Sequence, residues 1–177
     1  MPASQLSYEE SCRRLQEGYL EEGEIPPIPR RMPQADDEEP LGVNFFREFL
    51  GDGADLSNLT LPRTFFGRSE INNVFFQNTD LMESNLCWND FIEVDFSDAI
   101  LAGCDLRASN FTRVKFVATD LRQSDLRLSS FEECDFTNAE MAGTVLTPEQ
   151  GQLMALNDKQ RTEIAWTADP GPEPDGG

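Results

Sequence analysis

A five-residue hydrophobic period dominates the middle of the chain. Each fifth residue from Leu56 to Leu146 is apolar, although only 38% of the 177 residues are hydrophobic. A chance run of this length has a probability of roughly one in 10⁸, and no insertion interrupts the frame. The period fits neither the 3.6-residue turn of an α-helix nor the alternation of a flat strand. The pattern therefore predicts a repeat architecture.

A second set of positions lies two residues before each large one and is mostly small or β-branched, as at Ala99, Cys104 and Ser109. Residues two apart face the same side of an extended segment, so both sets point inward. The next inward residue lies three positions further on, where a straight strand would turn it outward. The chain must therefore bend after each large residue. The spacing predicts a polygonal coil with one short strand per side, stacked at about 4.8 Å.

The position between the two sets is often Asp or Asn, as in residues 54–58 (ADLSN), 104–108 (CDLRA), 109–113 (SNFTR) and 134–138 (CDFTN). This pattern resembles A(D/N)LXX, the repeat of the pentapeptide-repeat family. The resemblance implies an all-β solenoid, namely a right-handed quadrilateral β-helix with four pentapeptides per coil and about five coils in this chain.

The flanking sequences predict short α-helical caps at both ends of the solenoid. Asn44 is expected as the N-cap of the first capping helix, which Gly51 ends. Thr147 is expected as the N-cap of the second, with Leu153 and Leu156 covering the far end. The predicted organisation is an N-terminal helix with a Pro-rich, acidic extension (1–40), an N-terminal capping helix (41–53), the solenoid (54–148), a C-terminal capping helix and tail (149–167) and a disordered end (168–177).

Residues 7–10 (SYEE) form a capping-box sequence that predicts a helix over roughly residues 7–22, with Cys12, Leu15 and Tyr19 on its apolar stripe. Two interpretations of residues 1–40 stay open. The segment is either a tethered flap or loose tail, or an arm that binds a partner.

The charge balance has two interpretations: it favours a basic protein as partner, or it serves only solubility. The chain carries 14 Lys and Arg against 33 Asp and Glu, a formal net charge of −19. Such a charge disfavours direct contact with nucleic acid or an anionic membrane. The sequence contains no membrane-spanning stretch and no secretory signal. Its four cysteines form no disulfide or metal pattern, so a cytoplasmic location is expected.

No catalytic constellation is visible. Histidine is absent, which removes the most frequent general base and metal ligand. The Asp row is interpreted as local turn chemistry, in which each side chain bonds nearby backbone. The inward phenylalanines are expected to fill the core, and Cys104 and Cys134 to pack as small hydrophobes. We therefore expect no enzyme activity, no cofactor and no metal.

Two sets of outward residues are candidate binding surfaces, because repeats four apart stack on one face. The first lies on two neighbouring acidic faces and comprises Glu70, Asp90, Glu93, Glu132, Glu133, Asp95 and Asp98. The second is a column on a less acidic face, in which Trp88 and Leu128 lie beside Arg107 and Arg127. That composition is typical of binding hot spots. The alternative is that the C-terminal segment or the N-terminal helix covers the column.

The leading hypothesis is a non-catalytic protein that docks on a basic partner and blocks or protects it, as an immunity protein, an inhibitor or a DNA mimic does. The partner would be a toxin, a topoisomerase or another nucleic-acid-binding protein. A rod of about 23 Å matches only about 7 base pairs, which weakens the DNA-mimic version. The alternative is a scaffold or assembly module that binds through the Trp88 and Leu128 face or the termini. A homodimer through the C-terminal segment is a further alternative.

Overall fold

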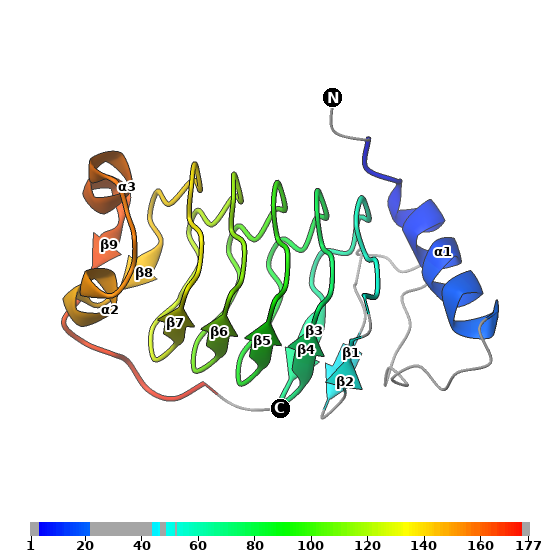
Figure 1. Cartoon of the computed structure of the whole chain (residues 1–177), viewed down its shortest axis with the longest axis horizontal. Coiled ribbons are helices and arrows are strands. Elements are labelled where there is room, and N and C mark those ends of the chain that lie inside the picture. The colour runs from blue at the N-terminus through cyan, green and yellow to red at the C-terminus, as the bar shows by residue number, and fades with distance from the viewer. Residues whose placement is uncertain (1–3, 22–43, 47–48, 52, 175–177) are drawn as a thin grey trace.

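The computed structural model describes residues 4–21, 44–46, 49–51 and 53–174, and its centre is a four-sided solenoid of stacked coils (Figure 1). Parallel backbone pairs join residues 20 positions apart, such as Asp55 with Phe75 and Thr60 with Asp80. Because each side takes five residues, a 20-residue offset means four sides per coil. The predicted solenoid is therefore confirmed.

The longest sheet runs along one side of the solenoid, and its strands β4, β5, β6 and β7 stack in parallel register. The other sides are held by single bridges between coils. In chain order the elements are α1 (Tyr8–Glu21), β1 (Asn44–Phe46), β2 (Phe49–Leu50), β3 (Phe65–Gly67), β4 (Glu70–Asn72), β5 (Asp90–Ile92), β6 (Asn110–Thr112), β7 (Ser130–Glu132), β8 (Val145–Leu146), α2 (Pro148–Gln152), α3 (Asp158–Glu163) and β9 (Ala165–Trp166).

The large residues of the five-residue period fill the axis, as expected. Phe91 and Phe111 stack with ring centroids 5.0 Å apart, and Phe111 stacks on Phe131 at 5.2 Å. A second phenylalanine ladder on the neighbouring side meets the first edge to face, as Phe91 and Phe96 do at 5.8 Å. Such aromatic pairs contribute roughly 0.5–1.5 kcal/mol beyond the burial of their area.

The corners of the coils share one backbone conformation. The second residue after each large one has a positive φ, as at Ala118 (53°) and Gly103 (69°). On three of the four sides the chain then closes a β-turn, as where Thr119 N–H donates to Phe116 O at 3.3 Å. The Asp or Asn before the large residue accepts from the backbone two positions on, as Asp95 does from Ser97 N–H at 2.9 Å. The local interpretation of the Asp row is thereby confirmed.

Both polar atoms of the buried Asn89 side-chain amide have hydrogen-bond partners. Its Nδ2 donates to Phe66 O at 2.7 Å and to Cys87 O at 3.0 Å, while its Oδ1 accepts from Ser69 N–H at 2.9 Å. Other coils use a hydroxyl at the same position, since Ser109 Oγ donates to Leu86 O at 2.9 Å. The small inward residues thus tie neighbouring coils together.

The expected N-terminal capping helix is wrong: strands β1 and β2 occupy that stretch. They pair with β3 and β4 and so continue the solenoid. The register changes from Leu50 with Ile71 to Asp55 with Phe75, so the first coil holds one extra residue between Leu50 and Asp55. Strand pairing satisfies the backbone more completely than an isolated helical turn, which explains the outcome.

Helix α1 instead covers the start of the solenoid (Figure 1). Its capping box is present, because Ser7 Oγ and the Glu10 carboxylate bond each other's backbone N–H groups. Ser11 Oγ accepts from Thr60 N–H at 2.8 Å, and Thr60 Oγ1 donates to Leu6 O at 2.7 Å. Leu15 is buried in the main core. The N-terminal segment therefore supplies partners that a preceding coil would otherwise give.

The Pro-rich and acidic stretches, residues 24–29 and 36–39, lie outside the described residues, as does the side chain of Tyr19.

The C-terminal cap keeps the 20-residue register. Strand β9 pairs with β8, so Val145 lies beside Ala165. Helices α2 and α3 replace the corners of this last coil, and each begins with a full capping box, Thr147 with Gln150 and Asn157 with Gln160. The prediction of Thr147 as an N-cap is confirmed.

Of the two residues expected over the far end, Leu156 packs against the core, whereas Leu153 does not. Leu153 is 81% exposed, whereas Met154 beside it is buried in the core together with Ile164. Because α2 ends at Gln152, the chain turns there and directs Met154 inward instead of Leu153.

Candidate protein-binding surfaces

The first acidic face carries strands β4 to β7, and its charged side chains are exposed. Glu70, Asp90, Glu93, Glu132 and Glu133 all point outward from this face. They are held at fixed spacing because their backbones belong to neighbouring coils in one parallel register. The sheet therefore presents carboxylates from successive coils as one array.

Few cations neutralise this array. Within the described residues, Arg113 is its one basic side chain, and its Nε lies 3.0 Å from Glu93 Oε1. Asp90 accepts from Asn110 Nδ2 at 2.7 Å, and Asn110 in turn accepts from Ser130 Oγ at 2.8 Å. This neutral chain of hydrogen bonds orders the Asp90 carboxylate without cancelling its charge.

On the adjoining face the two predicted residues differ. Asp98 is exposed, but Asp95 is only 8% exposed and accepts from Ser97 N–H and Gln77 Nε2. Asp95 thus holds a corner of the coil. We define the acidic surface as Glu70, Asp90, Glu93, Asp98, Glu132 and Glu133.

Phe75 is an exposed residue of the adjoining face that the sequence analysis did not include among the candidate binding residues. Its ring is 38% exposed, and its backbone lies between those of Asp55 and Asp95. The signal was present in the sequence, because Phe75 occupies an outward position where the repeat places Asp or Asn. An exposed aromatic ring beside carboxylates is typical of interface anchors.

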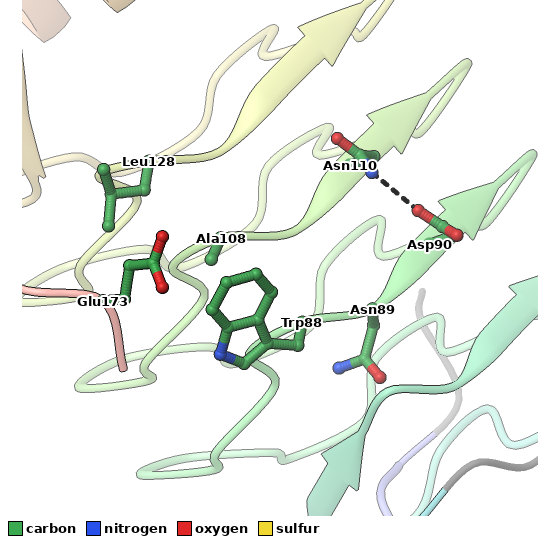
Figure 2. Close-up of a pocket in the computed structure, with 7 residues that line it drawn as sticks. All are labelled: Trp88, Asn89, Asp90, Ala108, Asn110, Leu128 and Glu173. Carbon is green, nitrogen blue, oxygen red and sulfur yellow. Dashed lines mark hydrogen bonds between the residues drawn. The ribbon is translucent and has the colours of Figure 1, made fainter. Parts of the chain in front are cut away.

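The Trp88 column, defined as Trp88, Ala108 and Leu128 with the neighbouring Arg107 and Arg127, lies on the side that precedes the strands. Figure 2 shows Trp88, Ala108 and Leu128 from successive coils lining a hollow that Glu173 also borders. Arg68 adds a cation–π contact, with its Cζ 5.5 Å from the Trp88 ring centroid. The structure therefore brings together the residues that the sequence grouped.

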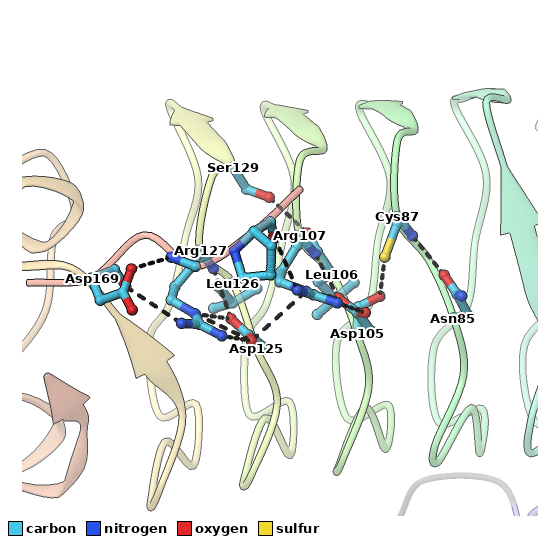
Figure 3. A network of polar contacts seen from close by, with 12 residues as sticks. Asn85, Cys87, Asp105, Leu106, Arg107, Asp125, Leu126, Arg127, Ser129 and Asp169 are labelled. Atoms are coloured by element: carbon cyan, nitrogen blue, oxygen red, sulfur yellow. Dashed lines mark hydrogen bonds and ion pairs between the residues drawn. The ribbon is translucent and has the colours of Figure 1, made fainter. Parts of the chain in front are cut away.

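Two carboxylates orient the arginines of the Trp88 column (Figure 3). Arg107 donates to Asp105 at 2.8 Å from Nε and 2.7 Å from Nη2. Arg127 binds Asp125 in the same way, at 3.0 Å and 2.7 Å. Burial alone would raise the pKa of Asp105, but hydrogen bonds from Arg107 and Cys87 outweigh it and lower that pKa. Burial also raises the pKa of the Cys87 thiol, which stays protonated.

The C-terminal segment lies over the Trp88 column. Trp88 Nε1 donates to Pro174 O at 2.8 Å, and Pro174 is buried. Residues 168–174, expected as part of a disordered end, thus have a defined position. Of the two covers considered, the C-terminal segment occupies the column, while α1 packs at the start of the solenoid.

The described part of the chain lacks a cluster of metal-binding side chains. No group of three or more His, Cys, Asp or Glu side chains there is arranged to hold a metal ion. The four cysteines are free, and Cys104 is buried with its pKa raised by burial to about 12. Among the described helices, none is long and apolar enough to span a membrane.

The repeat is recognised by comparison with known families. A family profile described as "Pentapeptide repeats" matches residues 52–86, 90–127 and 116–147 in eight copies. Together these ranges cover slightly more than half of the chain. The fold is the right-handed quadrilateral β-helix of such proteins. Comparison with curated protein sequences finds no significant match.

Three solved structures illustrate the likeness. HetL, a pentapeptide-repeat protein involved in heterocyst differentiation regulation in the cyanobacterium Nostoc, is 18% identical with a TM-score of 0.55 over 60% of this chain and 49% of HetL. A protein of the Arabidopsis thaliana thylakoid lumen is 25% identical with a TM-score of 0.48 over 64% of this chain and 72% of that one. Rfr23 from the cyanobacterium Cyanothece is 22% identical with a TM-score of 0.49 over 64% of each chain. The chain spans about half the length of HetL.

Proposed function

This chain belongs to the pentapeptide-repeat family, and from that premise we propose that it is a non-catalytic protein-binding module whose acidic surface docks on a basic surface of a partner protein. The observation that carries the proposal is the exposed array of carboxylates on β4 to β7, with Arg113 alone to neutralise it among the described residues. Such an array attracts a basic partner and accelerates its association.

The backbone that carries these carboxylates is rigid. Because the coils are locked in parallel register, Glu132 and Glu133 lose little backbone freedom when a partner binds. Phe75 supplies an apolar anchor on the adjoining face, where a pocket between basic residues of the partner would receive it. The partner class is therefore a basic protein such as a toxin, a topoisomerase or another nucleic-acid-binding protein.

The role is to block or protect that partner, because an acidic surface that occupies a nucleic-acid-binding site competes with nucleic acid. The free and largely buried cysteines suit the reducing cytoplasm as the place of action. Scaffolding through the Trp88 column is less favoured, since the C-terminal segment already covers that column.

The test is quantitative capture of partners from the native host with the purified full-length chain. We expect a stoichiometric basic partner whose capture falls at least tenfold when Glu132→Lys and Glu133→Lys are combined, and also falls as salt is raised. The matched control combines Glu83→Lys and Glu140→Lys, which changes the net charge equally on another face. Each of these control residues gives up only an exposed ion pair, with Arg63 or Lys159. Equal loss in both double variants, or capture that resists high salt, would contradict the proposal.

A further inference from the structure

Three carbonyl oxygens of the described part of the C-terminal segment accept hydrogen bonds from the Trp88 column. Arg127 Nη1 donates to Asp169 O at 3.3 Å, Arg107 Nη1 to Pro172 O at 3.3 Å, and Trp88 Nε1 to Pro174 O at 2.8 Å. Figure 3 shows the segment running past Arg127 and Arg107 on the outside of the coils. The segment thus runs back toward the start of the solenoid while one donor after another holds it.

The chemistry of the two sides is complementary. Guanidinium and indole groups only donate hydrogen bonds, so the Trp88 column offers donors and no side-chain acceptor of its own. A proline residue contributes a carbonyl acceptor and no N–H. The segment has proline at positions 170, 172 and 174, so it presents carbonyls while hiding few donors that would need a partner. The three donors of the column, Trp88, Arg107 and Arg127, therefore favour a proline-rich backbone, which offers carbonyl acceptors.

The donors are oriented before any peptide arrives. Asp105 and Asp125 each take Nε and Nη2 of their arginine, which leaves Nη1 directed at the segment. With the segment in place both arginine side chains are 19% exposed, and their pairs with Asp105 and Asp125 restrict them independently of it. Arg68 lies over the Trp88 ring, and this cation–π contact helps to orient the ring.

In the bound C-terminal segment, Arg127 leaves too little space for a side chain at Gly171. Gly171 has φ +70°, and a Cβ atom there would lie 2.8 Å from Arg127 Nη1. The backbone of the peptide therefore rests directly against the guanidinium, and a side chain at this position would push it away. The site fits an extended segment with proline on both sides of a glycine.

We propose that the Trp88 column is a binding site for a proline-rich extended segment of a partner protein, and that the chain's own C-terminal segment occupies it until that segment displaces it. A tethered occupant acts at an effective concentration of roughly millimolar, so the closed form discriminates against weak peptides. This site adjoins the acidic surface at Asp90, which also lines the hollow, but the proposal does not depend on the partner proposed for that surface.

The test uses the synthetic peptide of residues 168–177 as the probe and isothermal titration calorimetry as the readout. We expect saturable binding to a chain that ends at Thr167, and binding at least tenfold weaker to the full chain. Trp88→Ala in the shortened chain should weaken binding at least tenfold. A peptide with alanine in place of its three prolines should also bind at least tenfold more weakly.

A second opened variant guards against a folding defect in the shortened chain. Gly171→Val keeps the full length but dislodges the segment through the contact with Arg127, and the indole N–H resonance of Trp88 reports its release. Failure of the peptide to bind either opened form, or equal binding of the alanine peptide, would overturn the proposal. Dimerisation of the opened forms that the peptide blocks would assign the column to a second copy of the chain and would also overturn it.

Discussion

The side-chain amide of Gln160 donates to the carbonyl oxygen of Phe136 at 2.7 Å, and the same Nε2 reaches Ala139 O at 3.1 Å. Gln150 repeats the arrangement two sides away, with Leu126 O at 2.8 Å and Ser129 O at 2.9 Å. These carbonyls would otherwise face the next coil of the solenoid. At this end of the solenoid, the side-chain amides of Gln150 and Gln160 therefore supply the donors that a further coil would otherwise supply.

Gln160→Ala is expected to lower the free energy of unfolding by about 2–4 kcal/mol. The substitution removes the Gln160 donor from the carbonyl of Ala139, leaves the carbonyl of Phe136 with the Ala139 N–H, and removes half of a capping box. Urea unfolding monitored by circular dichroism measures the loss. The matched control is Gln152→Ala in α2, an exposed residue, which should change the value by less than about 0.5 kcal/mol. Similar effects of the two substitutions would contradict the capping role.

Asn89→Ala is expected to cost about 3 kcal/mol, since Ser69 N–H and the carbonyls of Phe66 and Cys87 lose their partner together. Asn89→Ser should cost less, because Ser109 performs the equivalent task in the next coil with a hydroxyl. The midpoint of thermal unfolding ranks the three proteins. A serine variant less stable than the alanine variant would show that the hydroxyl cannot replace the amide.

The corners predict opposite effects for two substitutions. Gly103 has φ 69°, and a Cβ there would meet Glu83 Cγ at an ordinary 3.5 Å, so Gly103→Ala tests the backbone conformation with little steric interference. We expect a loss of about 1 kcal/mol in stability. Ala118→Gly, at an exposed corner with φ 53°, should instead leave stability unchanged or raise it slightly. Chemical denaturation measures the change in the free energy of unfolding for each variant. Changes of the same sign in both variants would exclude the conformational explanation.

The hydrogen bonds from Arg122 lower the pKa of Asp120 below its ordinary value of 3.8. A carboxyl whose pKa is lower in the folded chain stabilises the fold above the unfolded value, and this contribution is lost as the pH falls through the folded pKa. Titration of the Asp120 carboxyl by NMR should therefore show a midpoint below 3.8. Arg122→Ala should raise that midpoint, whereas an unchanged midpoint would rule out the pair as its cause.

The sequence alone determined the solenoid, because its inward period is local chemistry repeated along the chain. A large residue at each fifth position, a small one two before it, and an Asp or Asn between them specify a strand and a bend without reference to distant residues. The same reasoning located Thr147 as an N-cap and grouped Trp88 with Leu128, Arg107 and Arg127, since register follows from counting.

Tertiary structure decided how the first coil begins and which side chains on the outer faces are covered. Residues 44–50 have a helical pattern, but the open edge of the first coil offers backbone partners, so β1 and β2 form instead. At the far end, Met154 is buried instead of Leu153. Phe75 is exposed and Asp95 is buried because neighbouring coils cover these two side chains to different extents. The segment at 169–174 has no local preference for order, and donors from three separate coils fix its position. A periodic core can be read from the sequence because it repeats, whereas caps and coverings depend on groups that only folding brings together.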